Sequence, residues 1–274
     1  MTIFRPKSRG AAGQGVLAMP ELARAAAFYQ AGRYAEAEAE ARTVAAARNW
    51  PPEDAPMALG LAALAVNAQG RHADALAAYD DLVPRFRKIF GARHAQTLIL
   101  RSNRAQVLTA LSRHAEAEAE CADIARAAAR GKGPEMPNIT VAARNGQVYA
   151  LNSQGRHAEA EAVVRAALAV PGVPAQFTLS LTLGLARSLN GQGRHAEGLV
   201  EAERAAAQYA DQAAQRSIAG AVELATANAL LGLDRATEAR AQASAGHEAC
   251  LAAFGPDHYR TVEARELLAR IDEA

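Results

Sequence analysis

Hydrophobic and polar residues along this chain follow a helical period, which a short polar phrase interrupts at regular intervals. The phrase occurs six times: Gly32-Arg-Tyr-Ala-Glu-Ala37, Gly70-Arg-His-Ala-Asp-Ala75, Ser112-Arg-His-Ala-Glu-Ala117, Gly155-Arg-His-Ala-Glu-Ala160, Gly193-Arg-His-Ala-Glu-Gly198 and Asp234-Arg-Ala-Thr-Glu-Ala239. Successive copies are 38, 42, 43, 38 and 41 residues apart. A period of this length indicates an array of similar units rather than one irregular core.

Small and apolar residues recur at fixed offsets from the first residue of each phrase, which we call the reference residue. Seven positions before it stand Ala25, Ala63, Ala105, Val148, Ala186 and Ala227. Five positions after it stand Ala37, Ala75, Ala117, Ala160, Gly198 and Ala239. Four positions before it stand Phe28, Val66, Leu108, Leu151, Leu189 and Leu230. Small side chains at the first two offsets let two helix axes approach closely, and the larger residue fills the layer between them.

The phrase is predicted to join two helices. Its glycine ends the first helix by adopting a positive φ, and its acidic residue lies in the first turn of the second helix. The first helices are expected near 20–31, 54–69, 95–111, 137–154, 174–192 and 213–232. The second helices are expected near 34–48, 72–89, 114–130, 157–169, 195–210 and 236–253. A last helix, near 257–272, has no partner and is expected to cap the array.

The pattern therefore predicts an all-α protein, a right-handed α-solenoid of six helix pairs with a C-terminal capping helix. Residues 19–274 are expected to form one superhelical domain, because a helix pair cannot bury its apolar face alone. Residues 1–18 have little apolar surface to bury and are expected to be a disordered tail.

These repeats resemble the tetratricopeptide repeat, from about residue 20 onward. Two loops narrow the resemblance, Phe90-Gly-Ala-Arg-His94-Ala-Gln-Thr97 and Phe254-Gly-Pro-Asp-His258-Tyr-Arg-Thr261. Each begins 20 residues after a reference residue, as in the longer repeat of kinesin light chain and its bacterial relatives. The other loops depart from this pattern, so the subfamily is assigned less firmly than the repeat itself.

The resemblance places the first helix of each pair on the concave wall of the solenoid. The helical period then puts the offsets thirteen, ten, six and three before the reference on the open face. Polar residues at these offsets are the candidate peptide-binding set: Asn67, Ser102, Gln106, Thr109, Asn145, Tyr149, Asn152, Arg187, Asn190 and Asn228.

Asparagine side chains can both donate to and accept from an extended peptide backbone. The resemblance implies this use for Asn67, Asn152 and Asn190, and Arg187 is the expected anchor for a carboxylate. The alternative is that these asparagines only cap carbonyl groups near the ends of their helices.

The sequence contains no motif that indicates an enzyme. A phosphate-binding glycine loop, a His-Glu-x-x-His pair and a Gly-x-Ser-x-Gly elbow are all missing from the sequence. The segment Gly191-Gln-Gly193 matches a loose dinucleotide fingerprint, but a helix precedes it where that fingerprint needs a strand. We therefore expect no catalytic residue and no cofactor.

The histidines and cysteines are expected to be structural. His72, His114, His157 and His195 share one repeat position, so neighbours lie roughly 10 Å apart, too far to share a metal that needs bonds of about 2 Å. Each ring is expected to pack into its helix-pair joint. Cys121 and Cys250 are expected to be buried apolar residues rather than a disulfide.

The charge balance of the chain bears on whether it binds polyanions. Thirty basic and 29 acidic side chains give a net charge of +1, which excludes a polyanion binder driven by bulk charge. The arginine after each reference residue is expected to pair with the acidic residue three positions later. The basic concentration from Arg85 to Arg113 leaves an anion-binding patch as an alternative.

The location is expected to be cytoplasmic. No apolar stretch approaches the roughly 18 residues of a membrane span, and the start of the chain lacks a signal peptide's apolar block. Arginine outnumbers lysine 27 to 3 and alanine occupies 72 positions, which suggests a GC-rich bacterial genome.

The sequence thus predicts a non-catalytic scaffold that binds a peptide or a protein segment in its concave groove. The alternative is a sensor that takes a small molecule or a signal peptide in the same groove. No membrane contact and no nucleic acid are expected, and a homodimer through the convex face remains open.

Overall fold

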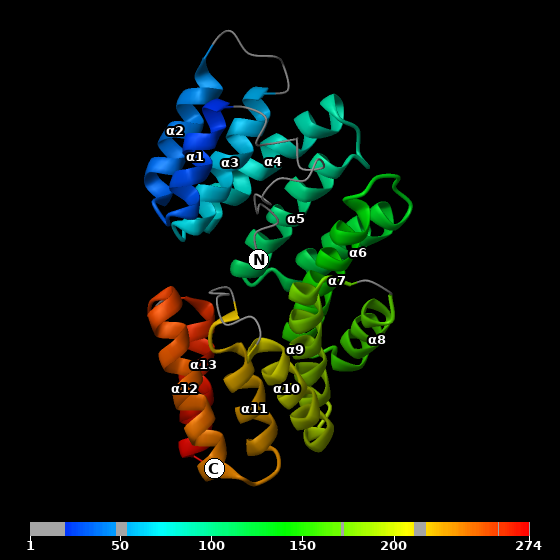
Figure 1. The fold of residues 1–274 in the computed structure, drawn as a ribbon, viewed down its shortest axis with the longest axis vertical. Coiled ribbons are helices and arrows are strands. Elements are labelled where there is room, and N and C mark those ends of the chain that lie inside the picture. The colour runs from blue at the N-terminus through cyan, green and yellow to red at the C-terminus, as the bar shows by residue number, and fades with distance from the viewer. Residues whose placement is uncertain (1–19, 48–53, 171–172, 211–217, 257, 274) are drawn as a thin grey trace. The chain divides into compact units, whose positions relative to one another are not determined.

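The computed structural model describes residues 20–47, 54–170, 173–210, 218–256 and 258–273, which form thirteen α-helices and no strand (Figure 1). The helices are α1 (Pro20–Gln30), α2 (Tyr34–Ala46), α3 (Asp54–Ala68), α4 (His72–Ile89), α5 (Ala95–Ala110), α6 (His114–Ala129), α7 (Met136–Ser153), α8 (His157–Leu168), α9 (Ala175–Gly191), α10 (His195–Ala210), α11 (Ala221–Leu231), α12 (Ala236–Phe254) and α13 (Tyr259–Asp272). The predicted all-α repeat fold is confirmed. The predicted tail, 1–18, lies outside the described residues.

The chain forms two compact units, and the boundary falls inside α7. Unit 1 ends at Ala143 and unit 2 begins at Arg144. Each unit is described by itself below, and the prediction of a single domain over 19–274 stays a prediction.

Within each unit the helices form two layers. The first helices of successive pairs contact one another, as α1, α3 and α5 do in unit 1 and α9, α11 and α13 do in unit 2. Four second helices pack between two consecutive first helices: α2 contacts α1 and α3, α4 contacts α3 and α5, α10 contacts α9 and α11, and α12 contacts α11 and α13. The first helices therefore have one face covered by second helices and one face that those helices leave open.

The small residues at the recurring offsets lie where these helices meet. All five alanines and the valine seven positions before the reference are at most 2% exposed, and the five alanines five positions after it are fully buried. The predicted close approach of helix axes is confirmed.

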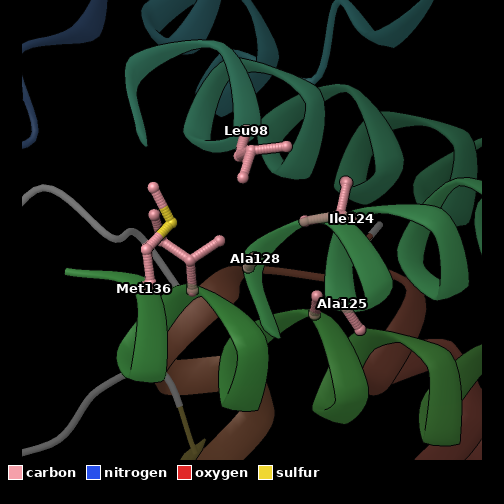
Figure 2. Packing of buried hydrophobic residues seen from close by; sticks show 7 residues of the cluster. Leu98, Ile124, Ala125, Ala128 and Met136 are labelled. Carbon is pink, nitrogen blue, oxygen red and sulfur yellow. The ribbon is translucent and has the colours of Figure 1, made fainter. Parts of the chain in front are cut away.

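A cluster of larger apolar side chains closes the core near the end of unit 1. Leu98 of α5, Ile124 and Ala128 of α6 and Met136 of α7 point toward one another in Figure 2. Burying a leucine or isoleucine side chain contributes about 1.5–3 kcal/mol. Local contacts of this kind, rather than one central core, hold each pair to the next.

The reference residue adopts the left-handed conformation that the sequence predicts. The glycines Gly32, Gly70, Gly155 and Gly193 have φ between 72° and 80°. Ser112 and Asp234 occupy the same position with φ of 57° and 59°. A side chain other than glycine is strained there, because its Cβ approaches the following carbonyl oxygen.

We therefore expect Ser112→Gly to raise the free energy of unfolding by about 0.5–1 kcal/mol, as relief of left-handed strain predicts. Urea denaturation followed by circular dichroism measures it. Ala110→Gly, two residues earlier inside α5, is the matched control and should lower stability by about the same amount. A loss of stability in Ser112→Gly would contradict the strain argument.

One helix starts later than predicted. The sequence pattern suggests a helix over 213–232, whereas α11 begins at Ala221, and 211–217 lie outside the described residues. Gly220 precedes it with φ of 73°, and a Cβ there would lie 2.4 Å from the carbonyl oxygen of Gly246. Only glycine fits this approach of the chain to α12, and it sets the start of the helix.

Candidate functional site

The ten predicted groove residues all lie on first helices. Four belong to unit 1, on α3 and α5, and six belong to unit 2, on α7, α9 and α11. Their side chains differ in exposure, from buried to half-exposed.

In unit 1 the predicted residues mainly bond to their own helix. The Oδ1 of Asn67 lies 2.8 Å from His72 Nδ1, and the Thr109 hydroxyl donates to the carbonyl of Ala105. Ser102 is 7% exposed and donates to the Leu98 carbonyl. The prediction that Ser102 faces an open groove is therefore wrong, because α5 turns that side chain into its packed face. Gln106 is half-buried on the same helix.

In unit 2 the asparagines three positions before the reference link neighbouring repeats. Asn152 is 4% exposed, and its Nδ2 donates to Ser188 Oγ at 3.0 Å and to the Gly184 carbonyl at 3.2 Å. Its Oδ1 lies 3.0 Å from His157 Nδ1. The prediction of an exposed, peptide-binding Asn152 is therefore wrong, and the alternative of a structural role holds for this residue.

The other two asparagines near helix ends in unit 2 also donate hydrogen bonds to backbone carbonyls. Asn190 Nδ2 donates to the Ala225 carbonyl of the next first helix, and Asn228 Nδ2 donates to the Leu224 carbonyl of its own helix. Both side chains remain half-exposed. Asn145, earlier on α7, is half-exposed and makes no side-chain hydrogen bond within the described residues.

Arg187 of α9 is partly exposed and makes two contacts within unit 2. Its guanidinium stands 5.3 Å from the centre of the Tyr149 ring, and its Nη2 is 2.8 Å from Glu263 Oε1 of α13. Its side chain is 38% exposed. The expected carboxylate contact is thus present, but the carboxylate belongs to the chain itself.

The repeated histidines pack into the joints, as the sequence predicts. A Cβ added at Gly191 would lie 2.4 Å from three ring atoms of His157, and one at Gly232 would lie 2.3 Å from three ring atoms of His195. The rings therefore lie flat against glycine backbone in the next repeat. Burial lowers the pKa of His72, and burial together with the charge of Arg187 lowers that of His157.

A dent on unit 1 was not anticipated from the sequence. Between α3 and α5 it measures about 10 Å³, and its lining is Met57, Gly60, Phe86, Gln96, Ile99, Leu100 and Asn103. Gly60 provides the space, since its absent Cβ would lie 3.5 Å from Leu100 and 3.8 Å from Phe86. The lining is mainly apolar, with two amides among it.

Asn103 is the distinctive member of this dent. It is 2% exposed, yet its Oδ1 has no hydrogen-bond partner among the described residues. Fully buried Tyr79 lies beside it, and burial raises the pKa of Tyr79 far above its usual value. A buried amide oxygen without a partner is costly, so it is a candidate acceptor for an N–H of a bound molecule.

Polar joints between repeats were also missed. Glu161 of α8 accepts from Gln192 Nε2 at 2.8 Å and from Arg194 Nη1 at 2.7 Å, and Glu38 of α2 accepts from Gln69 and Arg71 in the same way. The signal in the sequence is the pairing of Glu six after one reference with Gln one before the next. It occurs as Glu38 with Gln69, Glu118 with Gln154 and Glu161 with Gln192, whereas Leu76 and Leu199 are matched with Leu111 and Leu233.

This joint predicts a stability loss in acid. Hydrogen bonds from Gln192, Arg165 and Arg194 lower the pKa of Glu161 to about 2. Because this value is below that of the unfolded chain, the stabilisation is complete above pH about 4.5 and is lost as the pH falls toward 2. We expect Glu161→Gln to flatten that part of the pH dependence, measured as the urea midpoint from pH 7 to pH 2.5.

The control for this prediction is Glu266→Gln, which removes the same charge from an exposed carboxylate on α13. Its urea midpoints should follow those of the wild-type chain. Identical curves for Glu161→Gln and wild type would show that the joint carries no titrating contribution.

Charge pairing accounts for the last three basic residues of the predicted basic patch, Arg101, Arg104 and Arg113. Each arginine after a reference residue pairs with the acidic residue three positions later, for example Arg113 with Glu116 at 2.6 Å, which confirms that prediction. Arg101 is 5% exposed and pairs with Glu120 and Asp123 at 2.7 Å. The arginines of α5 are therefore neutralised within the fold and do not form an anion-binding patch.

Other chemistry is not assembled in the described part of the chain. No group of three His, Cys, Asp or Glu side chains there could hold a metal ion. Cys121 and Cys250 are buried and unpaired with each other, as predicted. Among the same residues, no helix is both long enough and apolar enough to span a bilayer.

Comparison with known proteins identifies the repeat. Residues 54–120 match the model of the tetratricopeptide repeat family. No curated protein matches the sequence. The fold is similar to that of the nearly identical repeats of a kinesin light chain protein from P. anserina, at 19% identity and a TM-score of 0.59 over 71% of this chain and 95% of that chain.

Two further solved structures share the fold. BtubC from P. vanneervenii is 15% identical with a TM-score of 0.58, over 70% of this chain and 79% of its own. A Rap protein, solved in complex with the competence and sporulation factor, is 12% identical with a TM-score of 0.58, over 91% of this chain and 73% of its own. At these identities the likeness concerns the fold alone.

Proposed function

We propose that this chain is a non-catalytic scaffold that binds a segment of a partner protein along the open face of its first helices. Residues 54–120 match the tetratricopeptide repeat, and the fold is similar to that of kinesin light chain repeats. The Rap protein of the same fold was solved with a bound factor, which supports the proposal at the level of the fold. The contacts within this chain, and not those of the similar structures, indicate which residues form the site.

The observation that carries the proposal is the dent between α3 and α5. Its floor and walls are apolar, from Phe86, Leu100 and Ile99, and its amides are Asn103 and Gln96. The dent admits only a group about the size of a water molecule, so a methyl group of a bound segment would meet its apolar lining there. Asn103 is added to the predicted set because its Oδ1 has no hydrogen-bond partner among the described residues, whereas Ser102 donates to its own helix.

The remaining predicted residues form a separate candidate set in each unit. In unit 1, Asn67, Gln106 and Thr109 lie half-buried on the same two helices. In unit 2, Asn145, Tyr149, Arg187, Asn190 and Asn228 are the half-exposed candidates. Asn152 is left out because its Nδ2 donates to α9 and its Oδ1 lies beside His157 Nδ1.

The test uses random dodecamer peptides displayed on phage and selected against the full chain. Isothermal titration of the selected peptides with wild type and with Gly60→Leu then locates the site. Selection of peptides whose affinity drops in Gly60→Leu supports the proposal, whereas peptides whose affinity is unchanged by a blocked dent overturn it for unit 1.

A further inference from the structure

Arg187 in unit 2 is held by residues from two other helices. Tyr149 of α7 supplies a ring face 5.3 Å below its guanidinium, and Glu263 of α13 supplies a carboxylate oxygen 2.8 Å from its Nη2. Aromatic support of this kind fixes the plane of the guanidinium and leaves its edge free to meet a carboxylate.

The ion pair joins the two first helices that flank α11. Both α9 and α13 contact α11, while α10 and α12 pack between the first helices on the other side. The Arg187–Glu263 pair therefore passes α11 on the face that the second helices leave open. It lies across the surface where a bound segment would run in this unit.

The pair differs from the structural ion pairs of the chain. Arg101 is 5% exposed and bonds to two carboxylates of the second helix in its own repeat. The side chains of Arg187 and Glu263 are 38% and 43% exposed, and a pair of this kind is weak because water competes for both charges. It can open without unfolding any helix.

We propose that Glu263 is an internal ligand of a carboxylate site formed by Arg187 and Tyr149, and that a partner segment displaces it with a carboxylate of its own. The inference rests on the proposed binding function and adds the chemistry of the partner in unit 2. A side-chain or C-terminal carboxylate restores the charge pairing of Arg187, whereas an amide of the same shape does not. The site therefore selects an acidic segment. The Arg187–Glu263 ion pair, which that segment must displace, lowers the apparent affinity of the chain for it.

N-acetylglutamate with its α-carboxylate blocked as a methyl amide is the probe, and N-acetylglutamine methyl amide is its uncharged control. Each is titrated into the full-length chain while the Nε–H resonance of Arg187 is followed by NMR, with the peak assigned by its loss in Arg187→Lys. We expect Glu263→Gln to bind the charged probe about two- to fivefold more tightly than wild type, the range that a half-exposed pair allows. Glu266→Gln, on the same helix, should match wild type.

Equal affinities for wild type and Glu263→Gln would overturn the proposal, and so would equal responses to the two probes. Glu263→Ala provides a second variant with the carboxylate removed, and circular dichroism verifies that both are folded. The result is independent of the dent at Gly60, because that dent lies in unit 1. Failure here with success of the peptide selection would leave the scaffold proposal intact.

Discussion

Replacing Gly60 with leucine is expected to reduce the affinity of selected peptides about tenfold or more, which corresponds to about 1.4 kcal/mol. The added side chain would fill the dent between α3 and α5, where about 10 Å³ is available and the neighbouring atoms are well packed. Glycine inside a helix costs roughly 0.5–1 kcal/mol relative to alanine, while overpacking typically costs about 1–3 kcal/mol, so a net loss of stability of up to about 2 kcal/mol is expected. Isothermal titration and thermal unfolding measure the two effects separately.

Two variants control this prediction. Gly60→Ala places a Cβ at ordinary contact distances of 3.5 and 3.8 Å and should retain binding. Ala77→Leu adds similar bulk on the exposed face of α4, a second helix, and should also retain binding. Loss of binding in Ala77→Leu but not in Gly60→Leu would place the site on the second helices instead.

Replacing Asn152 with alanine is expected to lower the free energy of unfolding by about 2–3 kcal/mol. The substitution removes hydrogen bonds to Gly184 and Ser188 and leaves the buried Nδ1 of His157 without its partner. The cost of an unpaired buried polar group accounts for this magnitude. Urea denaturation followed by circular dichroism measures the loss.

Asn145→Ala on the same helix is the matched control. Its side chain is half-exposed and makes no hydrogen bond within the described residues, so a change within about 0.5 kcal/mol is expected. If Asn152→Ala also changed stability by so little, the hydrogen bonds that link α7 to α9 would not be formed in solution.

The helices and joints could be predicted from the sequence because the repeat presents each feature several times. Ala63 and Ala105 occupy one offset and are both buried, so the prediction for one supports the other. The local phrase also fixes its own ion pair, since Arg113 and Glu116 are one turn apart. Repetition and short range together make these features readable.

The candidate site was less predictable because exposure depends on a small rotation of each helix. The 3.6-residue period places Asn152 and Arg187 on one face, yet Asn152 turns into the gap toward α9 while Arg187 stays exposed. The dent is lined by Asn103, which follows the predicted Ser102 in the sequence, and not by Ser102 itself. A period assigns a face but cannot choose between adjacent residues at its edge.

Contacts between one repeat and another were also not predicted from the sequence. Glu161 meets Gln192 and Arg194 of the next repeat, and Arg187 meets Glu263 of the last helix. Neither follows from local spacing, although the matched Glu and Gln positions recur in the sequence. Comparing each repeat with its neighbour, rather than aligning all repeats to one reference, would have revealed the first of these.

Photo-crosslinking tests the central claim most directly. A selected dodecamer carrying a benzophenone group at each position in turn is bound to the full chain, irradiated, and mapped by mass spectrometry. The proposed scaffold predicts labels on the open faces of first helices, beginning with Met57, Gln96 and Ile99 beside the dent. Labels confined to the second helices α2, α4, α6, α8, α10 and α12 would contradict it.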